Sequence, residues 1–339
     1  MLDLFPSREA GPFGRRFRRE RGARIPVTVV TGFLGAGKTT LIRRFLKSPE
    51  GAGTAVIVNE FGAVGIDDAL LRDSAEETVL LGNGCVCCIT RTDLQVALRK
   101  LVFDRERGTV PPFARVIIET SGLADPSPIL QTFSTDRALG GEFHIDVVLA
   151  VTDAVNGETE LDSAPEARKQ VILADRIVMS KTDLASASAV ASLTRRLKTL
   201  NVHAAIDIAI AGAIDPSRIV EPTTRERGAF VAEAEHADGV ASFVVTQDQP
   251  MQWPVFSRAM ETLIALRGSD LLRVKGILNV AGCRGPVVVQ YVQHLAHPPV
   301  ELEIWPDANR DSRIVFITRG IAESDVKALL SAIAALAKP

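Results

Sequence analysis

Three of the four cysteines in this chain lie within four positions, in the segment LGNGCVCCIT at residues 81–90. They are Cys85, Cys87 and Cys88. A disulfide between Cys85 and Cys88 would leave Cys87 out, and burial in a core would not require the clustering. Three thiolates this close can bind one soft transition-metal ion, with Glu60, a histidine or water completing its coordination shell. We therefore favour a metal site over a disulfide or a redox C-x-x-C pair, and place buried structural cysteines third.

The segment GFLGAGKTT at residues 32–40 matches the phosphate-binding pattern G-x-x-x-x-G-K-[ST], between an apolar, β-branched run and a helical pattern. Glycines let backbone N–H groups surround phosphate oxygens at the start of a helix, where the partial charge is positive. We expect Lys38 to neutralise the β- and γ-phosphates and the Thr39 hydroxyl to bind Mg²⁺. The predicted nucleotide-binding residues of this loop are Gly32, Gly35, Ala36, Gly37, Lys38, Thr39 and Thr40.

The segment SKTD at residues 180–183 ends another apolar run. Asp183 can accept hydrogen bonds from the N1 and N2 groups of guanine, which adenine does not offer. The stem of Lys181 can pack along the base. This motif usually begins with asparagine, which braces the base-binding loop, and Ser180 offers one hydroxyl in its place. We predict that the nucleotide is GTP, with affinity reduced by the serine and specificity retained.

A third motif, VIIETSG at residues 116–122, is an apolar run that ends in Glu119 and then Gly122. A carboxylate in this position can hold a water bound to Mg²⁺ or orient the attacking water. The backbone N–H of Gly122 can reach the γ-phosphate. We predict that Lys38, Glu119 and Gly122 are the catalytic residues. The other interpretation is an ordinary strand end with an exposed glutamate.

Several motifs, in this order, closely resemble those of the CobW-type GTPases, which are metal-chaperone members of the SIMIBI class of P-loop NTPases. They are GFLGAGKTT, NEFGAVGID (59–67), GNGCVCC (82–88), IIETSGLADPSP (117–128), SKTDL, SDLLRVKGILNVAG (269–282) and SRIVFITRG (312–320). The resemblance implies a Mg²⁺-dependent GTP hydrolase that binds a transition metal at the C-x-C-C cysteines and delivers it to a client protein or cofactor pathway. It also implies that Glu60 and Asp67 belong to a switch region, with Asp67 and Glu119 acting on Mg²⁺ directly or through water.

The delivered metal is expected to be zinc, since a compact thiolate site suits Zn²⁺, with Co²⁺ second and Fe²⁺ third. The cysteines lie between the two segments expected to respond to the γ-phosphate, so GTP could assemble the metal site and hydrolysis could dismantle it. The alternative is a regulatory GTP switch that senses metal without delivering it. A small-molecule kinase is less well supported, because kinases seldom need to discriminate guanine.

Five short apolar runs that end in polar residues position these motifs. They are IPVTVVTG (25–32), TAVIVNE (54–60), ARVIIET (114–120), DVVLAVTD (146–153) and DRIVMSKTD (175–183), and a helical pattern covers Lys38 to Leu46. Such runs, alternating with helix-compatible segments, predict a doubly wound α/β domain with a mostly parallel sheet. Ligands of such folds bind at the carboxyl ends of the strands.

The pattern changes after about residue 212, where a polar stretch with little periodicity begins. Beyond it, strand-like segments at 240–246, 271–282, 285–292 and 312–318 accompany helical patterns at 253–267 and 323–337. They predict a smaller α+β domain with an antiparallel sheet and helices on one face. The predicted division is an Arg-rich tail (1–24), a P-loop GTPase domain (25–212), a linker (213–239) and a CobW-like C-terminal domain (240–339).

The bulk composition fits a globular protein of two domains, with 339 residues, of which 46% are hydrophobic and 24% charged. A net charge of −2 argues against a general nucleic-acid binder. No uncharged apolar run approaches the length that crosses a bilayer. Four cysteines fit a reducing compartment better than a secreted disulfide scaffold. We therefore expect a cytoplasmic protein whose partners are GTP and a metal-requiring client, without nucleic acid or membrane.

Overall fold

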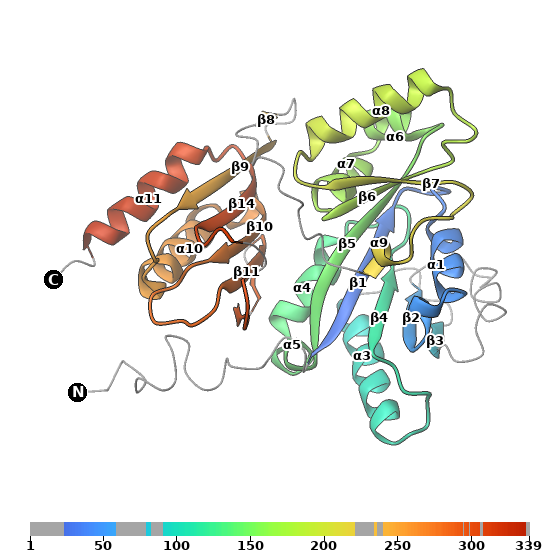
Figure 1. Ribbon diagram of the computed structural model, residues 1–339, viewed down its shortest axis with the longest axis horizontal. Helices are drawn as coiled ribbons and strands as arrows, with labels where there is room; N and C mark the ends of the chain where they lie inside the picture. Colours follow the sequence, from blue (N-terminus) through green and yellow to red (C-terminus); the bar gives the residue numbers. More distant parts are fainter. Residues whose placement is uncertain are drawn as a thin grey trace. The chain divides into compact units, whose positions relative to one another are not determined.

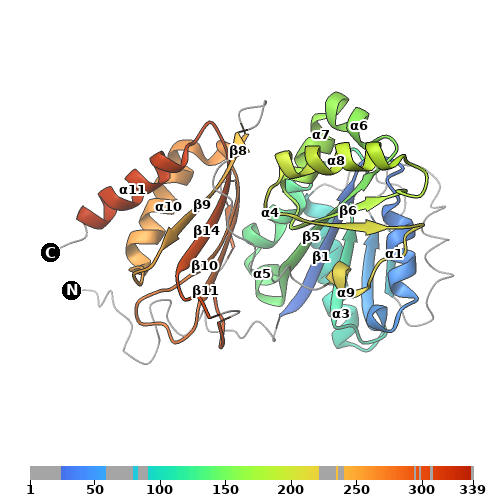
Figure 2. The ribbon, with the colours of Figure 1, turned by 45° about the horizontal axis from the view of Figure 1, so that its top comes forward.

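The computed structural model describes residues 24–58, 79–82, 91–220, 234–235, 240–293, 295–297, 299–305 and 308–336. The chain forms two compact units, of which the first is Ile25–Arg225 and the second contains Glu226–Pro339. Figures 1 and 2 show a sheet with helices in each unit.

The first unit is built on a seven-stranded sheet in which every pairing is parallel. Its strands are β1 (Ile25–Gly32), β2 (Thr54–Val58), β3 (Val79–Gly82), β4 (Arg115–Glu119), β5 (Phe143–Asp153), β6 (Arg176–Ser180) and β7 (Ala205–Ala209). They lie in the order β3-β2-β4-β1-β5-β6-β7. β1 therefore lies between β4 and β5, at the point where the strand order reverses, and this is where ligands bind in such sheets.

Helices cover both faces of this sheet (Figure 1). They are α1 (Lys38–Leu46), α3 (Arg91–Glu106), α4 (Ser127–Thr135), α5 (Arg137–Glu142), α6 (Gly157–Ser163), α7 (Pro165–Ile172), α8 (Ala187–Leu200) and α9 (Ser217–Val220), with a 3₁₀ turn, η3, at Pro49–Gly51. One apolar cluster joins α1 and α9 to the sheet, and another joins α6, α7 and α8 to it. Burial from both sides explains why β1 is apolar almost throughout. The predicted doubly wound α/β fold is confirmed.

All five predicted strands are present, and the predicted helix Lys38–Leu46 is α1. The two strands that the sequence analysis missed, β3 and β7, are the edges of the sheet. β7 has one neighbour in the sheet and is only partly buried, so its apolar pattern is weaker. In β7, for example, Ile208 is exposed while Ala209 is buried.

The second unit contains a separate sheet in which every pairing is antiparallel. Its strands are β8 (Ala234–Glu235), β9 (Val240–Gln247), β10 (Leu271–Leu278), β11 (Val287–Val292), β12 (Leu295–Ala296), β13 (Val300–Glu301) and β14 (Ser312–Arg319). They lie in the order β12-β11-β10-β14-β9-β8, with β13 also on β11.

Two helices, α10 (Trp253–Arg267) and α11 (Glu323–Leu336), pack on one face of the second sheet (Figure 2), and a 3₁₀ turn, η4, follows at Gly268–Asp270. The core contains stacked Phe243 and Phe316 rings, whose centroids are 5.4 Å apart, together with Phe256 and Met260 from α10. The predicted antiparallel α+β C-terminal domain is confirmed as a fold.

The predicted linker, residues 213–239, begins before the end of the first unit. Helix α9 lies within this range, and its Ile219 is buried in the core that α1 forms with the sheet. The first unit therefore extends past the predicted boundary at residue 212. Among the helices that the structure describes, none is long and apolar enough to cross a membrane.

Candidate functional site

The loop between β1 and α1 requires glycine where the backbone approaches its neighbours. Gly32 has a φ of 140°, and a Cβ atom there would lie 2.2 Å from the carbonyl oxygen of Val151 on β5. Gly37, the residue before α1, has a φ of 96°. Both values are ones that L side chains rarely adopt. The loop therefore takes the tightly curled path that the phosphate-binding motif predicts.

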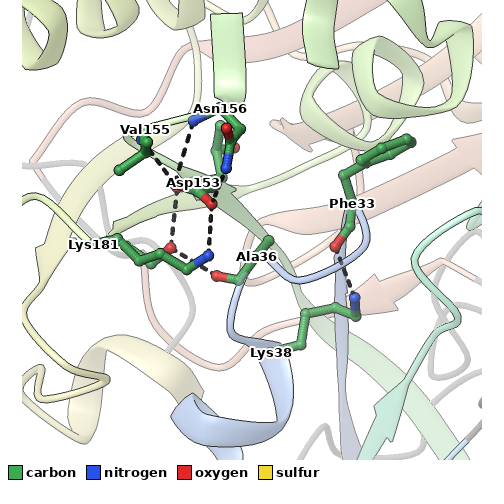
Figure 3. Close-up of polar contacts among 9 residues, drawn as sticks. Phe33, Ala36, Lys38, Asp153, Val155, Asn156 and Lys181 are labelled. Atoms are coloured by element: carbon green, nitrogen blue, oxygen red, sulfur yellow. Dashed lines mark hydrogen bonds and ion pairs between the residues drawn. The ribbon is translucent and has the colours of Figure 1, made fainter. Parts of the chain in front are cut away.

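Lys38, the first residue of α1, directs its ammonium group back across this loop (Figure 3). Its Nζ atom donates hydrogen bonds to the carbonyl oxygens of Gly32 at 2.9 Å and Phe33 at 3.0 Å. The side chain is buried. The positive charge thus lies beside the loop backbone, where it can neutralise a phosphate.

Thr39, in the first turn of α1, contacts Glu119 at the end of β4. The Thr39 hydroxyl donates to Glu119 Oε1 at 2.7 Å, and Glu119 is only 4% exposed. Glu119 ends β4, in register with Val30 of β1, so the sheet itself delivers the carboxylate to the start of α1. Exposure of Glu119, which the alternative interpretation required, is contradicted. Two adjacent oxygen donors of this kind suit a hard cation such as Mg²⁺.

The loop after β4 packs directly against the phosphate-binding loop. A Cβ atom at Gly122 would lie 2.6 Å from the backbone nitrogen of Leu34. Two residues earlier, the Thr120 N–H donates to the Val30 carbonyl at 2.9 Å, and the Thr120 hydroxyl donates to that of Thr31, also at 2.9 Å. Gly122 is therefore held beside the P-loop, on the same side as Glu119.

On the other side of the P-loop, Ser180 replaces the usual asparagine. Its hydroxyl donates to the carbonyl oxygen of Ala36 at 2.6 Å, and the side chain is buried. A serine at the end of β6 therefore braces the P-loop with one hydrogen bond, as the sequence analysis expected it could.

Lys181 follows in a left-handed conformation, with a φ of 55°. Its ammonium group forms an ion pair with Asp153, the last residue of β5, at 2.6 Å (Figure 3). Asp153 is 1% exposed and also accepts hydrogen bonds from the Val155 N–H at 2.7 Å and the Asn156 side chain at 3.1 Å. Asp153 was not among the predicted site residues, although its place at the end of an apolar run was a usable signal.

The electrostatics of this region favour an ionised Asp153. Burial raises the pKa of Asp153, but the hydrogen bonds from Lys181, Val155 and Asn156 together outweigh it, so the pKa lies below its ordinary value. Glu160 on α6 shows the opposite balance. Burial, followed by the charge of Asp153, raises the pKa of Glu160. Asp153 is therefore a fixed negative charge that faces Lys181.

Asp183 lies in the turn after β6 and is exposed, so its carboxylate is accessible to a base. Thr40, on the first turn of α1, is exposed as well. The ends of β1, β4, β5 and β6 thus bring Lys38, Thr39, Glu119, Gly122, Ser180 and Lys181 to one edge of the sheet, together with Asp153. The assignment of individual residues to GTP atoms remains a prediction.

The predicted transition-metal ligands Cys85, Cys87, Cys88 and Glu60, and the predicted Mg²⁺ residue Asp67, lie outside the described residues. Within the described ranges, no group of three or more His, Cys, Asp and Glu side chains could hold a metal ion. The remaining cysteine, Cys283, is partly buried and packs against the core of the second unit.

Comparison with known proteins agrees with this geometry in both units. Residues 26–207 match the CobW/HypB/UreG nucleotide-binding domain, and residues 240–334 match the cobalamin synthesis protein cobW C-terminal domain. The chain belongs to the CobW/HypB/UreG family. The strand ends described above lie within the residues that match the nucleotide-binding domain.

Relatives in the family resemble the chain over nearly its whole length. It is 36% identical over 314 residues to the zinc chaperone YjiA of Escherichia coli K12, covering 90% of this chain and 97% of YjiA. It is 30% identical to the zinc chaperone CobW of a Sinorhizobium species, covering 94% and 99% of the two chains. The crystal structure of zinc-bound YjiA GTPase from E. coli superposes with a TM-score of 0.64 at 31% identity, covering 91% and 99%.

Proposed function

We propose that this protein is a Mg²⁺-dependent GTPase that binds zinc at Cys85, Cys87 and Cys88 and delivers it to a metal-requiring client protein. GTP hydrolysis follows from membership of the family, whose relatives over the full chain length include a zinc-bound GTPase. The observation in this chain that carries the hydrolytic step is the Thr39–Glu119 hydrogen bond, since it joins the P-loop to the end of the neighbouring strand.

The chain's own residues divide the work of hydrolysis between them. Lys38 places a positive charge at the P-loop backbone, and Glu119 lies where it can orient a water molecule. Gly122 offers a backbone N–H beside Leu34 of the P-loop. Thr39 and Glu119 would hold Mg²⁺, which would supply positive charge to the β- and γ-phosphates.

Zinc is the cargo that the relatives' names support, since YjiA and CobW are both zinc chaperones. Thiolates suit zinc, and Glu60 can complete the coordination shell. The cysteines lie between the segment containing Glu60 and the Glu119 strand, so both ends of the metal segment adjoin residues expected to respond to the γ-phosphate.

Metal titration in different nucleotide states tests the proposal. Zinc or Co²⁺ should bind at one site per chain, and more tightly with Mg²⁺ and a non-hydrolysable GTP analogue than with GDP. A typical coupling of about 1–3 kcal/mol corresponds to a five- to 150-fold difference in affinity, and the metal should tighten binding of the GTP analogue by the same factor. Co²⁺ bound by thiolates would also show a charge-transfer absorption band.

Serine substitutions provide the controls for this titration. Cys87→Ser and Cys88→Ser should lose the absorption band and the coupling, yet retain nucleotide binding. Cys283→Ser should change neither, because Cys283 packs against the core of the other unit.

Delivery is tested by transfer of zinc to an apo zinc enzyme during GTP turnover. Equal metal affinity with the GTP analogue and with GDP would contradict coupling between the nucleotide and the metal site. Retention of zinc by the protein throughout GTP turnover would favour a regulatory protein that senses metal without delivering it.

A further inference from the structure

Helix α7 contacts the loop that carries Gly122 through a buried side chain to which no function is yet assigned. Gln170 is 1% exposed and lies 46–48 residues away in sequence from the atoms that it binds. Its Nε2 atom donates to the carbonyl oxygen of Gly122 at 3.1 Å and to that of Ala124 at 3.0 Å. One amide group therefore joins two points of the loop after β4.

These acceptors fix which way the Gln170 amide points. A carboxamide has a donor end and an acceptor end, and both loop neighbours are backbone carbonyls, which only accept. The NH₂ group must therefore face the loop. A carboxylate of the same shape would place a negative oxygen against two carbonyl oxygens and would push the loop away.

A second contact from the same helix reaches the same loop. Lys169, the residue before Gln170, forms an ion pair with Asp125. Asp125 also accepts a hydrogen bond from the Ser127 N–H at 2.8 Å, at the start of α4. Consecutive side chains of α7 thus hold the loop at residues 122, 124 and 125.

On its opposite side, the loop packs tightly against the P-loop. Gly122 lies so close to Leu34 that a Cβ atom would overlap the P-loop backbone. The loop is therefore held between the P-loop and α7, and the position of the Gly122 backbone depends on both surfaces.

We propose that Gln170 is a positioning residue for GTP hydrolysis, which holds Gly122 at the P-loop so that its N–H meets the γ-phosphate. Lys169 supports the same loop through Asp125. This inference rests on the proposed role of Gly122 in GTP hydrolysis and adds the residue that sets its position.

A matched control is Asn201, the residue after α8, which binds the C-terminal end of α7. Asn201 is also 1% exposed, and its Nδ2 atom donates to the carbonyl oxygens of Val171, Ile172 and Ala174 at 2.9–3.1 Å. Both amides are buried donors to backbone carbonyls. Asn201 binds the end of α7 itself, whereas Gln170 binds the loop beside the nucleotide site.

The test compares Gln170→Glu with Asn201→Asp in the full chain. Each change replaces a donor by an acceptor without altering shape. Gln170→Glu should lower kcat for GTP hydrolysis by about tenfold or more, because small displacements of a catalytic group are costly. It should also reduce the preference for a GTP analogue over GDP, while GDP affinity stays within about twofold of the parent. Asn201→Asp should lower Tm but leave kcat and that preference unchanged.

Gln170→Met provides a second variant in case the glutamate prevents folding, since it removes the donor without adding charge. A lower kcat with retained GDP affinity in either folded variant supports the proposal. Parental kcat and nucleotide preference in folded Gln170→Met, or an equal loss of kcat in Asn201→Asp, would overturn it. Failure of the parent itself to hydrolyse GTP would instead count against the GTPase function.

Discussion

The two sides of the proposed nucleotide site, a phosphate side and a base side, are built by different means. The phosphate side consists of the P-loop, residues 32–39, with Glu119 and Gly122. It is held mainly by close approaches of the backbone, because Gly32 lies against Val151 and Gly122 against Leu34. Neither contact leaves space for a Cβ atom.

The base side consists of Asp153, Ser180, Lys181 and Asp183. Side-chain hydrogen bonds hold it, from Ser180 to the P-loop and from Lys181 to Asp153. Asp183 itself is exposed. Backbone contacts tolerate little change, whereas side-chain contacts can be exchanged singly. We therefore expect changes on the phosphate side to affect chemistry, and changes on the base side to affect affinity and specificity.

The largest effect is expected for Lys38→Ala, which removes the positive charge from the phosphate side. Loss of a group that stabilises developing charge should lower kcat by about a hundredfold to a thousandfold. The melting temperature should change little, since β1 and α1 retain their apolar contacts with the sheet. Phosphate release and thermal unfolding measure the two quantities. Lys47→Ala, at the exposed end of α1, is the control, and parental turnover in Lys38→Ala would show that the P-loop is not catalytic.

Asp183→Asn tests the base side. The variant keeps one acceptor oxygen and should lose one of two hydrogen bonds from guanine, and a hydrogen bond to a charged group contributes about 1.5–3 kcal/mol. GTP affinity should therefore fall by about tenfold to 150-fold, while kcat at saturation stays near the parental value. Xanthosine triphosphate should become the better ligand, because xanthine has a carbonyl where guanine has its amino group. Competition binding measures both nucleotides, and unchanged GTP affinity would refute the assignment to guanine.

The same comparison explains what could be predicted from the sequence. The P-loop, the Glu119 strand and the SKTD turn are local motifs, in which neighbouring residues specify both the backbone and the chemistry. The five central strands were found because burial on both faces makes them continuously apolar. The edge strand β7 was missed because it lacks that burial.

Contacts between residues that lie far apart in the sequence could not be predicted from it. Asp153 binds Lys181 across 28 positions because β5 and β6 are neighbours in the sheet, which no local pattern specifies. Gln170 is one glutamine in a short helix, and its role follows only from where α7 packs. Strand order therefore decides which polar residues at strand ends and on helices become partners.

On the phosphate side, Gly122→Ala tests the close approach of the Gly122 backbone to Leu34. The added Cβ atom must displace either the loop or the P-loop, so kcat should fall by about tenfold. Overpacking should also reduce the free energy of unfolding by about 1–3 kcal/mol. Gly140→Ala on α5 is matched to it, since a Cβ atom there would lie 2.5 Å from the Phe133 carbonyl oxygen. Both variants should be destabilised, but only Gly122→Ala should lose activity; equal activity losses would contradict a local role for Gly122.

The smallest effect on hydrolysis is expected for Asp153→Asn, which removes the charge that holds Lys181. The KM for GTP should rise only about fivefold, since a hydrogen bond contributes about 1 kcal/mol net. Stability should show the change more clearly. The folded pKa of Asp153 is lower than its ordinary value, so its carboxylate stabilises the fold at pH values above about 4. That contribution is lost as the pH falls through the folded pKa.

Urea unfolding of the parent and of Asp153→Asn between pH 7 and pH 2 measures this contribution. The difference in unfolding free energy should be largest at neutral pH and should shrink as the pH drops below about 4, because protonation makes the parent resemble the variant. Asp162→Asn is the control, since Asp162 pairs with Arg196 on the surface and such pairs contribute about 0–1 kcal/mol. A difference for Asp153→Asn that does not vary with pH would mean that Asp153 holds Lys181 through shape rather than charge. The base side would then be held by close packing, as the phosphate side is, and the two sides would not differ in how they are built.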